Sequence, residues 1–181
     1  MKYILLSFII GLTLKVSAQI NYKYQNNLSF SYSETIENYK MLDSLYANAK
    51  LVEIGKSDIG KPLHLFVVSA DADFSPESLH NRGKAVLLVN NGIHPGEPCG
   101  IDASLRFAED LLSKENKLLK NTVVCIIPFY NIGGGLNRSC CSRAMQNGPQ
   151  EYGFRGNAQN RDLNRDFIKC DSENAKAFTK I

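Results

Sequence analysis

Apolar residues recur along the chain in two patterns, one nearly continuous and one with the period of a helix. The continuous runs are residues 85–90 (AVLLVN) and 122–128 (TVVCIIP), each of strand length. Between them, residues 99–113 carry apolar side chains at helical spacing, and Pro98 suits the start of a helix. Continuous apolar strands around an amphipathic helix indicate strands covered on both faces. This pattern predicts an α/β fold.

The segment before this unit predicts a helix that follows an irregular lead-in. Residues 21–33 are polar and aromatic without a clear period, and we expect them to lie over the domain. A helix is expected from about residue 33 to residue 50, with Ser33 as its N-cap and Glu34 in its first turn. Its apolar face would pack on the sheet.

Two further strands are expected after this helix. They cover residues 51–55 and 63–70, and the sequence GKSDIGKP joins them through a turn marked by Gly and Pro. This arrangement is typical of an antiparallel hairpin at a sheet edge. The complete prediction is therefore a mixed β-sheet flanked by helices on both faces.

The last fifty residues are less regular. Residues 131–165 show no sustained apolar period, and a loop of this length is usually functional or disordered. Its many Arg and Asn residues favour a functional loop. A helical pattern begins again at Asp171 or Ser172, and no capping residue closes it before Ile181. We therefore expect the fold to be incomplete at its carboxyl end.

The first 18 residues have the features of an export signal. Lys2 precedes an apolar run from Tyr3 to Leu14, and Ala18 is small enough for signal peptidase. The run is shorter than the roughly 20 residues that a membrane-spanning helix needs. We expect an exported protein, periplasmic or secreted, without a membrane span after cleavage. The expected organisation is a signal peptide (1–18), a lead-in and helix (19–50) and a partial catalytic domain (51–181).

Charge and cysteine content narrow the function classes further. The net charge is +3, and Lys2 and Lys15 leave with the signal, so no basic surface indicates nucleic acid as a partner. The five cysteines are an odd number for an oxidising compartment, and their spacing matches no CxxC zinc pattern. We assign none of them to catalysis.

The stretch NGIHPGEPCG carries candidate chemistry. His94 follows the carboxyl end of an apolar strand, where ligand crevices form in open α/β sheets. Glu97 comes three residues later, across a turn shaped by Pro95 and Gly96, so imidazole and carboxylate can converge on one point. Both side chains are good zinc ligands, although an HxxE pair alone is weak support for a metal site.

A second motif strengthens the case for a metal site at His94 and Glu97. The stretch NRDLNRDF, residues 160–167, contains the tripeptide NRD twice. Arginine binds a carboxylate through two parallel hydrogen bonds, and a neighbouring asparagine can add a donor. An enzyme that removes the last residue of a peptide needs a metal to activate water and such a fork for the terminal carboxylate.

Together these motifs resemble the zinc metallocarboxypeptidases of the carboxypeptidase A type, peptidase family M14. GKSDIGKP is similar to the family's early hairpin, HPGE to its first zinc-binding motif, and DLNRDF to its substrate-carboxylate motif. They occur in the family's order and cover most of the chain after the signal. Only the second NRD follows Asp-Leu and precedes Phe, so only that copy matches.

The resemblance implies roles for individual residues. His94 and Glu97 would be zinc ligands, and Asn164 and Arg165 would bind the carboxyl terminus of a peptide substrate. Asp162 and Arg161 would be only the approach to this motif. An arginine upstream would stabilise the oxyanion of the tetrahedral intermediate; Arg155 is our candidate, and Arg143 and Arg138 stay open.

The same resemblance implies residues that this chain lacks. The family has a third zinc ligand, a histidine, and a glutamate general base beyond the Asn-Arg pair. His64 and His80 both precede His94 and are expected to be structural or solvated. We therefore expect one zinc ion, a peptide substrate with a free carboxyl terminus, and little activity from this chain alone.

Two alternatives stay open at this point. An N-acyl amino acid deacylase of the aspartoacylase type shares an HxxE pair and a DLNR motif, although the proline in HPGE and the early hairpin favour a carboxypeptidase. A metal-free module could instead keep the carboxylate clamp and bind peptide termini without hydrolysis.

Overall fold

Four strands form one mixed sheet in the computed structural model, which describes residues 19–143 and 146–181. The strands are β1 (Ala49–Lys56), β2 (Pro62–Val68), β3 (Ala85–Asn90) and β4 (Thr122–Ile127), in the order β1-β2-β4-β3. β1 pairs with β2 and β2 with β4 antiparallel, whereas β3 and β4 are parallel. The predicted hairpin at a sheet edge is confirmed. The predicted signal peptide lies outside the described residues.

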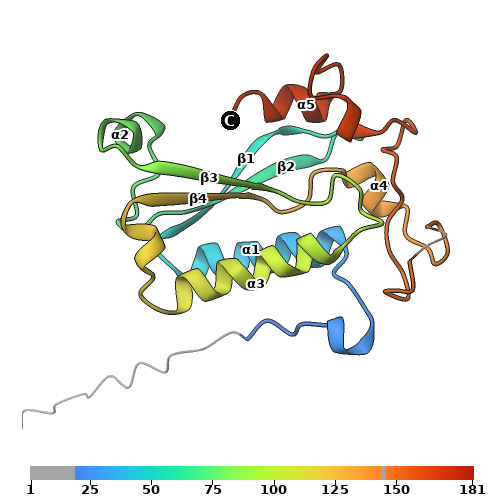
Figure 1. Ribbon diagram of the computed structural model, residues 1–181, viewed down its shortest axis with the longest axis horizontal. Helices are drawn as coiled ribbons and strands as arrows, with labels where there is room; N and C mark the ends of the chain where they lie inside the picture. The colour runs from blue at the N-terminus through green and yellow to red at the C-terminus, as the bar shows by residue number, and fades with distance from the viewer. Residues whose placement is uncertain (1–18, 144–145) are drawn as a thin grey trace, which may run out of the picture.

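Helices cover both faces of this sheet, as the sequence predicts (Figure 1). The α-helices are α1 (Tyr32–Leu45), α2 (Pro76–Asn81), α3 (Cys99–Ser113), α4 (Ile132–Leu136) and α5 (Glu173–Phe178). Single 3₁₀ turns are η1 (Tyr24–Asn26), η2 (Lys117–Lys120) and η3 (Leu163–Arg165). α1 and α3 lie side by side on one face, and α5 lies over β1 on the other. Among the described residues, no helix combines the length and apolar character needed to cross a bilayer.

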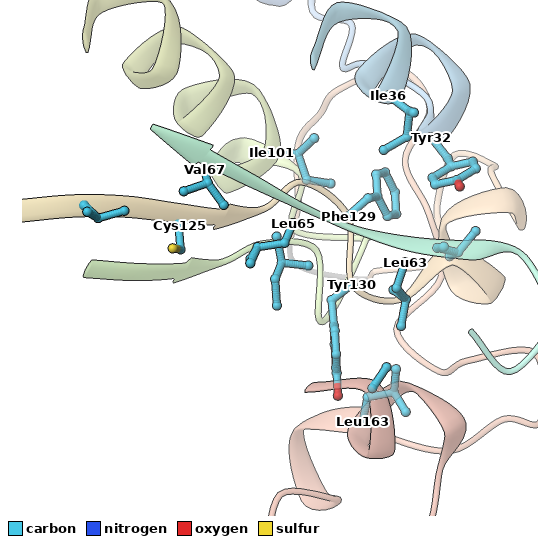
Figure 2. Packing of buried hydrophobic residues seen from close by; sticks show 14 of the residues in the cluster. Tyr32, Ile36, Leu63, Leu65, Val67, Ile101, Cys125, Phe129, Tyr130 and Leu163 are labelled. Carbon is cyan, nitrogen blue, oxygen red and sulfur yellow. The ribbon is translucent and has the colours of Figure 1, made fainter. Parts of the chain in front are cut away.

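The core has two layers because the side chains of β4 alternate between the faces of the sheet. Val124 and Ile126 join the layer beneath α1 and α3, which also contains Tyr39, Phe66 and Leu105. The second layer contains Val123, Cys125 and Ile127 with residues of β2 and of the chain after β4, and it also includes residues of α1 and α3 (Tyr32, Ile36 and Ile101). Figure 2 shows this second layer, in which Tyr130 extends from the end of β4 towards Leu163 of η3.

The start of α1 differs from the prediction. Ser31, not Ser33, is the N-cap: its hydroxyl accepts a hydrogen bond from the Glu34 amide, and the Glu34 carboxylate accepts one from the Ser31 amide at 2.9 Å. This capping box needs a Glu three residues after the cap, and Ser33 has Ile36 there. The helix also ends at Leu45, because Ala49 already begins β1.

β3 is not covered on both faces, contrary to the expectation from its apolar run. It is an edge strand, and Val86 and Leu87 are 62% and 41% exposed. Its side chains point to the two faces of the sheet, where they need packed elements for burial, and among the described residues only β4 pairs with this strand.

The remaining differences concern short elements. α2 was not predicted, although Ser75 as N-cap and Pro76 in the first turn are helix-start signals; this helix carries His80. The long loop after residue 131 contains α4 and an isolated bridge between Ser139 and Tyr152. α5 begins after the N-cap Ser172, as expected.

The capping box generates a stability test. Ser31→Ala removes the side-chain acceptor for the Glu34 amide and should lower the free energy of unfolding by about 1 kcal/mol. Ser33→Ala is the matched control and should change it by less than about 0.5 kcal/mol, as surface substitutions usually do. Urea denaturation followed by circular dichroism measures both values. Equal losses in the two variants would contradict the assignment of the cap.

Candidate active site

The candidate residues gather where β3 and β4 end. Because these strands are parallel, their carboxyl ends lie at the same edge of the sheet. The pairing extends past the strands: the Tyr130 amide donates to the Asn91 carbonyl at 2.8 Å, and the Asn131 amide donates to the Gly92 carbonyl at 3.0 Å. The segments that carry His94 and Asn131 therefore leave the sheet together.

Asn131 holds two loops of the candidate site in place. Its side-chain amide donates to the Ile93 carbonyl and to the Arg155 carbonyl, both at 3.1 Å, and its side-chain oxygen accepts from the Gly134 amide. The residue is fully buried, so these bonds are shielded from water. Asn131 therefore positions Arg155 next to His94. The sequence analysis missed it, although a polar residue just after an apolar strand was the available signal.

The HPGE segment is a tight turn pressed against a neighbouring loop. The Glu97 amide donates to the His94 carbonyl at 2.8 Å, and the Gly153 amide donates to the Pro95 carbonyl at 3.1 Å. A Cβ atom on Gly96 would lie 2.9 Å from the Gly153 carbonyl oxygen, a contact that only glycine avoids. The turn thus needs glycine between the two candidate ligands.

His94 and Glu97 converge as the sequence predicts. The His94 Nδ1 atom lies 3.7 Å from the Glu97 Oε1 atom. The imidazole is only 9% exposed, whereas the Glu97 side chain is 46% exposed. The imidazole is thus enclosed by its surroundings, whereas the carboxylate faces solvent.

Asp162 is the central residue that the sequence analysis missed. Its Oδ1 atom lies 2.8 Å from His94 Nε2, and its Oδ2 atom accepts from Arg155 Nη2 at 2.9 Å and from Arg155 Nε at 3.2 Å. Partial burial alone would raise the pKa of Asp162, but the bonds from His94, Arg155 and the Asn164 amide outweigh it and lower the pKa to about 2. Asp162 is an anion that joins the two motifs, not merely the approach to one of them.

These contacts determine which nitrogen of His94 carries the proton. Arg155 Nη1 lies 3.3 Å from His94 Nδ1, and a guanidinium can only donate. Nδ1 must therefore accept, so in the neutral ring Nε2 carries the proton and donates it to Asp162. The single lone pair of Nδ1 accepts from Arg155 Nη1, and the Glu97 Oε1 atom lies 3.7 Å from the same nitrogen.

Three arginines were candidates for the stabilising cation, and their positions differ. Arg155 contacts Asp162, His94 and, at 3.8 Å, the Glu97 carboxylate. Arg143 pairs with Glu97 at 2.6 Å. Arg138 donates to the backbone carbonyls of Ser29, Phe30 and Glu151, which is a structural role.

Asn164 and Arg165 lie beside this cluster on η3 and are exposed. The buried Leu163 between Asp162 and Asn164 packs in the same core layer as Tyr130 and anchors the turn (Figure 2). Arg165 lines a cavity of about 470 Å³, which Arg161 also lines. In the described part of the chain, no hydrogen bond or ion pair joins the side chains of Asn164 or Arg165 to His94 or Glu97.

A second and larger cavity, of about 650 Å³, is lined by Glu97. Asp102 and Cys99 of α3 line it together with residues of the lead-in. Burial raises the pKa of Asp102 to about 6, although the Phe30 amide donates to its carboxylate and Arg138 is nearby. Asp102 is thus an acid whose charge changes in mildly acidic solution.

The donor atoms of His94 and Glu97 fit a zinc ion. With bonds of 2.0 to 2.2 Å, two donors on a tetrahedral zinc lie roughly 3.4 Å apart, close to the observed separation. The other ring nitrogen of His94, Nε2, bonds to the Asp162 carboxylate, and a metal-binding histidine usually has such a carboxylate on its second nitrogen. Residues 19–143 and 146–181 contain no group of three or more His, Cys, Asp or Glu side chains placed to hold a metal ion.

The family model for zinc carboxypeptidases matches residues 35–179, which is most of the chain. The chain belongs to the zinc carboxypeptidase family. The resemblance inferred from HPGE and DLNRDF is thereby confirmed. A search of curated protein sequences gives no match.

Solved carboxypeptidase structures share the fold of this family member. The metallo-carboxypeptidase of Burkholderia cenocepacia has a TM-score of 0.63 at 17% identity, over 84% of this chain and 37% of that one. The metallo-carboxypeptidase of Pseudomonas aeruginosa, in complex with (2-guanidinoethylmercapto)succinic acid, has a TM-score of 0.61 at 18% identity, over 84% and 36%. Thrombin activatable fibrinolysis inhibitor has a TM-score of 0.63 at 19% identity, over 88% and 45%. The chain therefore spans less than half the length of each of these three proteins.

The raised pKa of Asp102 predicts a pH dependence of stability. Between its ordinary pKa of 3.8 and about 6, folded Asp102 keeps a proton that the unfolded chain has released. Its contribution to the free energy of unfolding therefore falls as the pH rises through this range. Asp102→Asn should remove that fall, and urea denaturation from pH 4 to 7 measures it.

The control is Asp110→Asn, which changes a more exposed carboxylate of the same helix. This variant should keep the pH dependence of the wild type. Parallel curves for wild type and Asp102→Asn would show that the Asp102 carboxyl is not perturbed.

Proposed function

We propose that this chain is the amino-terminal part of an exported zinc carboxypeptidase that hydrolyses the last peptide bond of peptides with a free carboxyl terminus. One observation carries the proposal: the Asp162 carboxylate binds both His94 of the HPGE motif and Arg155, and it begins the DLNR motif. Two sequence motifs with complementary chemistry thus meet in one site.

His94 and Glu97 would hold one zinc ion through Nδ1 and a carboxylate oxygen. When bound, the zinc ion would polarise the scissile carbonyl and lower the pKa of a water molecule. Asp162 keeps the proton of His94 on Nε2, so Nδ1 carries no proton and could serve as a ligand in place of accepting from Arg155. Arg143 and Arg155 both pair with Glu97, which places two cations beside the carboxylate that would hold the metal.

Arg155 is the proposed electrostatic stabiliser of the reaction. Its guanidinium is fixed by two bonds to Asp162 and lies within 3.8 Å of the Glu97 carboxylate. A preoriented cation at this position stabilises negative charge that develops on the substrate oxygen. Asn164 and Arg165 are the proposed carboxylate clamp, since both are exposed and the cavity beside Arg165 can admit a substrate terminus.

A third zinc ligand and a general base would come from further residues of a longer protein. Two observations support this view: the chain spans 36% to 45% of the related structures, and the apolar edge strand β3 has a free side. In this longer protein, residues 1–18 would be the export signal, 19–50 the lead-in and helix, and 51–181 the first part of the catalytic domain. The given chain alone would have little activity.

Zinc binding tests the ligand assignment in the complete protein. His94→Ala should abolish stoichiometric zinc, and Asp162→Asn should weaken zinc binding roughly 10- to 100-fold, because the ring loses its charged partner. Isothermal titration and metal analysis after dialysis provide the measurements. His80→Ala, on α2, is the matched control and should bind zinc like the wild type. A full zinc content in His94→Ala would refute the assignment.

The duplicated tripeptide provides a matched pair of variants for the substrate clamp. Arg165→Ala should lower kcat/KM for peptides with a free carboxyl terminus roughly 10- to 150-fold, the usual value of a charged hydrogen bond. Arg161→Ala should have a much smaller effect. Amidated peptides should be affected little by either change, and equal loss on both peptide types would exclude the clamp.

The same assay distinguishes the reaction class. A carboxypeptidase should hydrolyse peptides and leave N-acyl amino acids unchanged, whereas a deacylase would show the opposite preference. Peptide binding that survives removal of zinc, without hydrolysis, would instead indicate a binding module.

A further inference from the structure

Two adjacent cysteines lie on an exposed turn of the long loop. Cys140 and Cys141 are both solvent-exposed, and the Sγ atom of Cys141 lies 2.7 Å from the Sγ atom of Cys140. Neighbouring side chains in an extended segment point to opposite faces. Here the backbone of Cys141 is left-handed, with φ of 69°, and the two sulfur atoms lie next to each other.

The turn is anchored on both sides. Before it, Ser139 and Tyr152 exchange two backbone hydrogen bonds of 3.0 and 3.2 Å. After it, the Arg143 amide contacts the hydroxyl of the buried Tyr152, and the Arg143 guanidinium pairs with Glu97. The paired sulfur atoms therefore belong to a positioned turn, and their contact has a structural cause.

The other cysteines lack such a partner in the described part of the chain. Cys125 is buried in β4, where burial raises the pKa of its thiol, and Cys170 donates to the Phe167 carbonyl. Cys99 is exposed at the start of α3 and has no cysteine within hydrogen-bond distance. Only Cys140 and Cys141 combine exposure with sulfur contact.

We propose that Cys140 and Cys141 are a reversible redox site that closes to a vicinal disulfide by exchange with a low-molecular-weight disulfide. The thiolate of one cysteine attacks the small disulfide, forms a mixed disulfide and releases one thiol. The second cysteine attacks that mixed disulfide, forms the bond between the two Sγ atoms and releases the second thiol. Two cysteine thiols are oxidised, one disulfide is reduced to two thiols, and both protons end on the released thiols.

The adjacency of the two residues makes this bond easy to reopen. Consecutive Cα atoms are about 3.8 Å apart, shorter than the roughly 4.4 to 6.8 Å that an unstrained disulfide spans. Exposed and strained disulfides are the labile kind that thiols reduce readily. The site is thus suited to reversible modification and not to permanent cross-linking. This inference needs neither zinc nor peptidase activity.

The test uses oxidised glutathione on the complete protein, followed by acid quenching, maleimide alkylation and peptide mass spectrometry. The peptide with both cysteines should be lighter by two hydrogen atoms, carry no maleimide, and return to the dithiol with dithiothreitol. In Cys140→Ser and Cys141→Ser, the remaining cysteine cannot close the bond. Its glutathione adduct should exceed that on the wild-type pair by roughly tenfold or more.

Cys99→Ser is the matched control, because it removes another exposed cysteine and should leave closure of the pair unchanged. The proposal is overturned if both wild-type cysteines are alkylated or glutathionylated under these conditions. It is equally overturned if either of them is found linked to Cys99, to Cys170 or to a second molecule.

Discussion

The site depends on one carboxylate. Asp162 accepts bonds from the His94 ring, from the Arg155 guanidinium and from the Asn164 amide, and so connects segments 68 residues apart in the chain. These bonds fix the tautomer of the imidazole, the orientation of the guanidinium and the start of the η3 turn. A neutral or shorter side chain at this position could not satisfy all three donors with a negative charge.

The sheet makes this convergence possible. β3 and β4 are parallel neighbours, so the loops that follow them begin at one edge, and Asn131 bonds both the His94 loop and the Arg155 loop. The early hairpin supports the same region, because the Asp58 carboxylate accepts from the Ala158 amide at 2.7 Å. The long loop is thus held by polar contacts to its surroundings, and its Arg and Asn residues are positioned without regular secondary structure.

The local pattern of the sequence was sufficient to predict much of the fold and part of the candidate site. The helix over residues 99–113 and the strand over 85–90 have the predicted bounds, and the convergence of His94 and Glu97 follows from one short turn. Asp162 and Asn131 could not be found this way, since their roles arise from contacts between distant segments. The exposure of β3 was missed for a related reason: an apolar run shows that a strand needs cover, but not which residues supply it.

The free edge of β3 also affects how this chain behaves in solution. Its outer backbone groups form a template for another strand, and the exposed side chains of Val86, Leu87 and Leu88 make that template apolar. Charged residues, prolines and bulges usually protect natural sheet edges. The six residues of β3 contain no charged residue and no proline. Among the described residues only β4 pairs with β3, so a strand added on the other side would gain backbone hydrogen bonds and cover these apolar side chains at the same time.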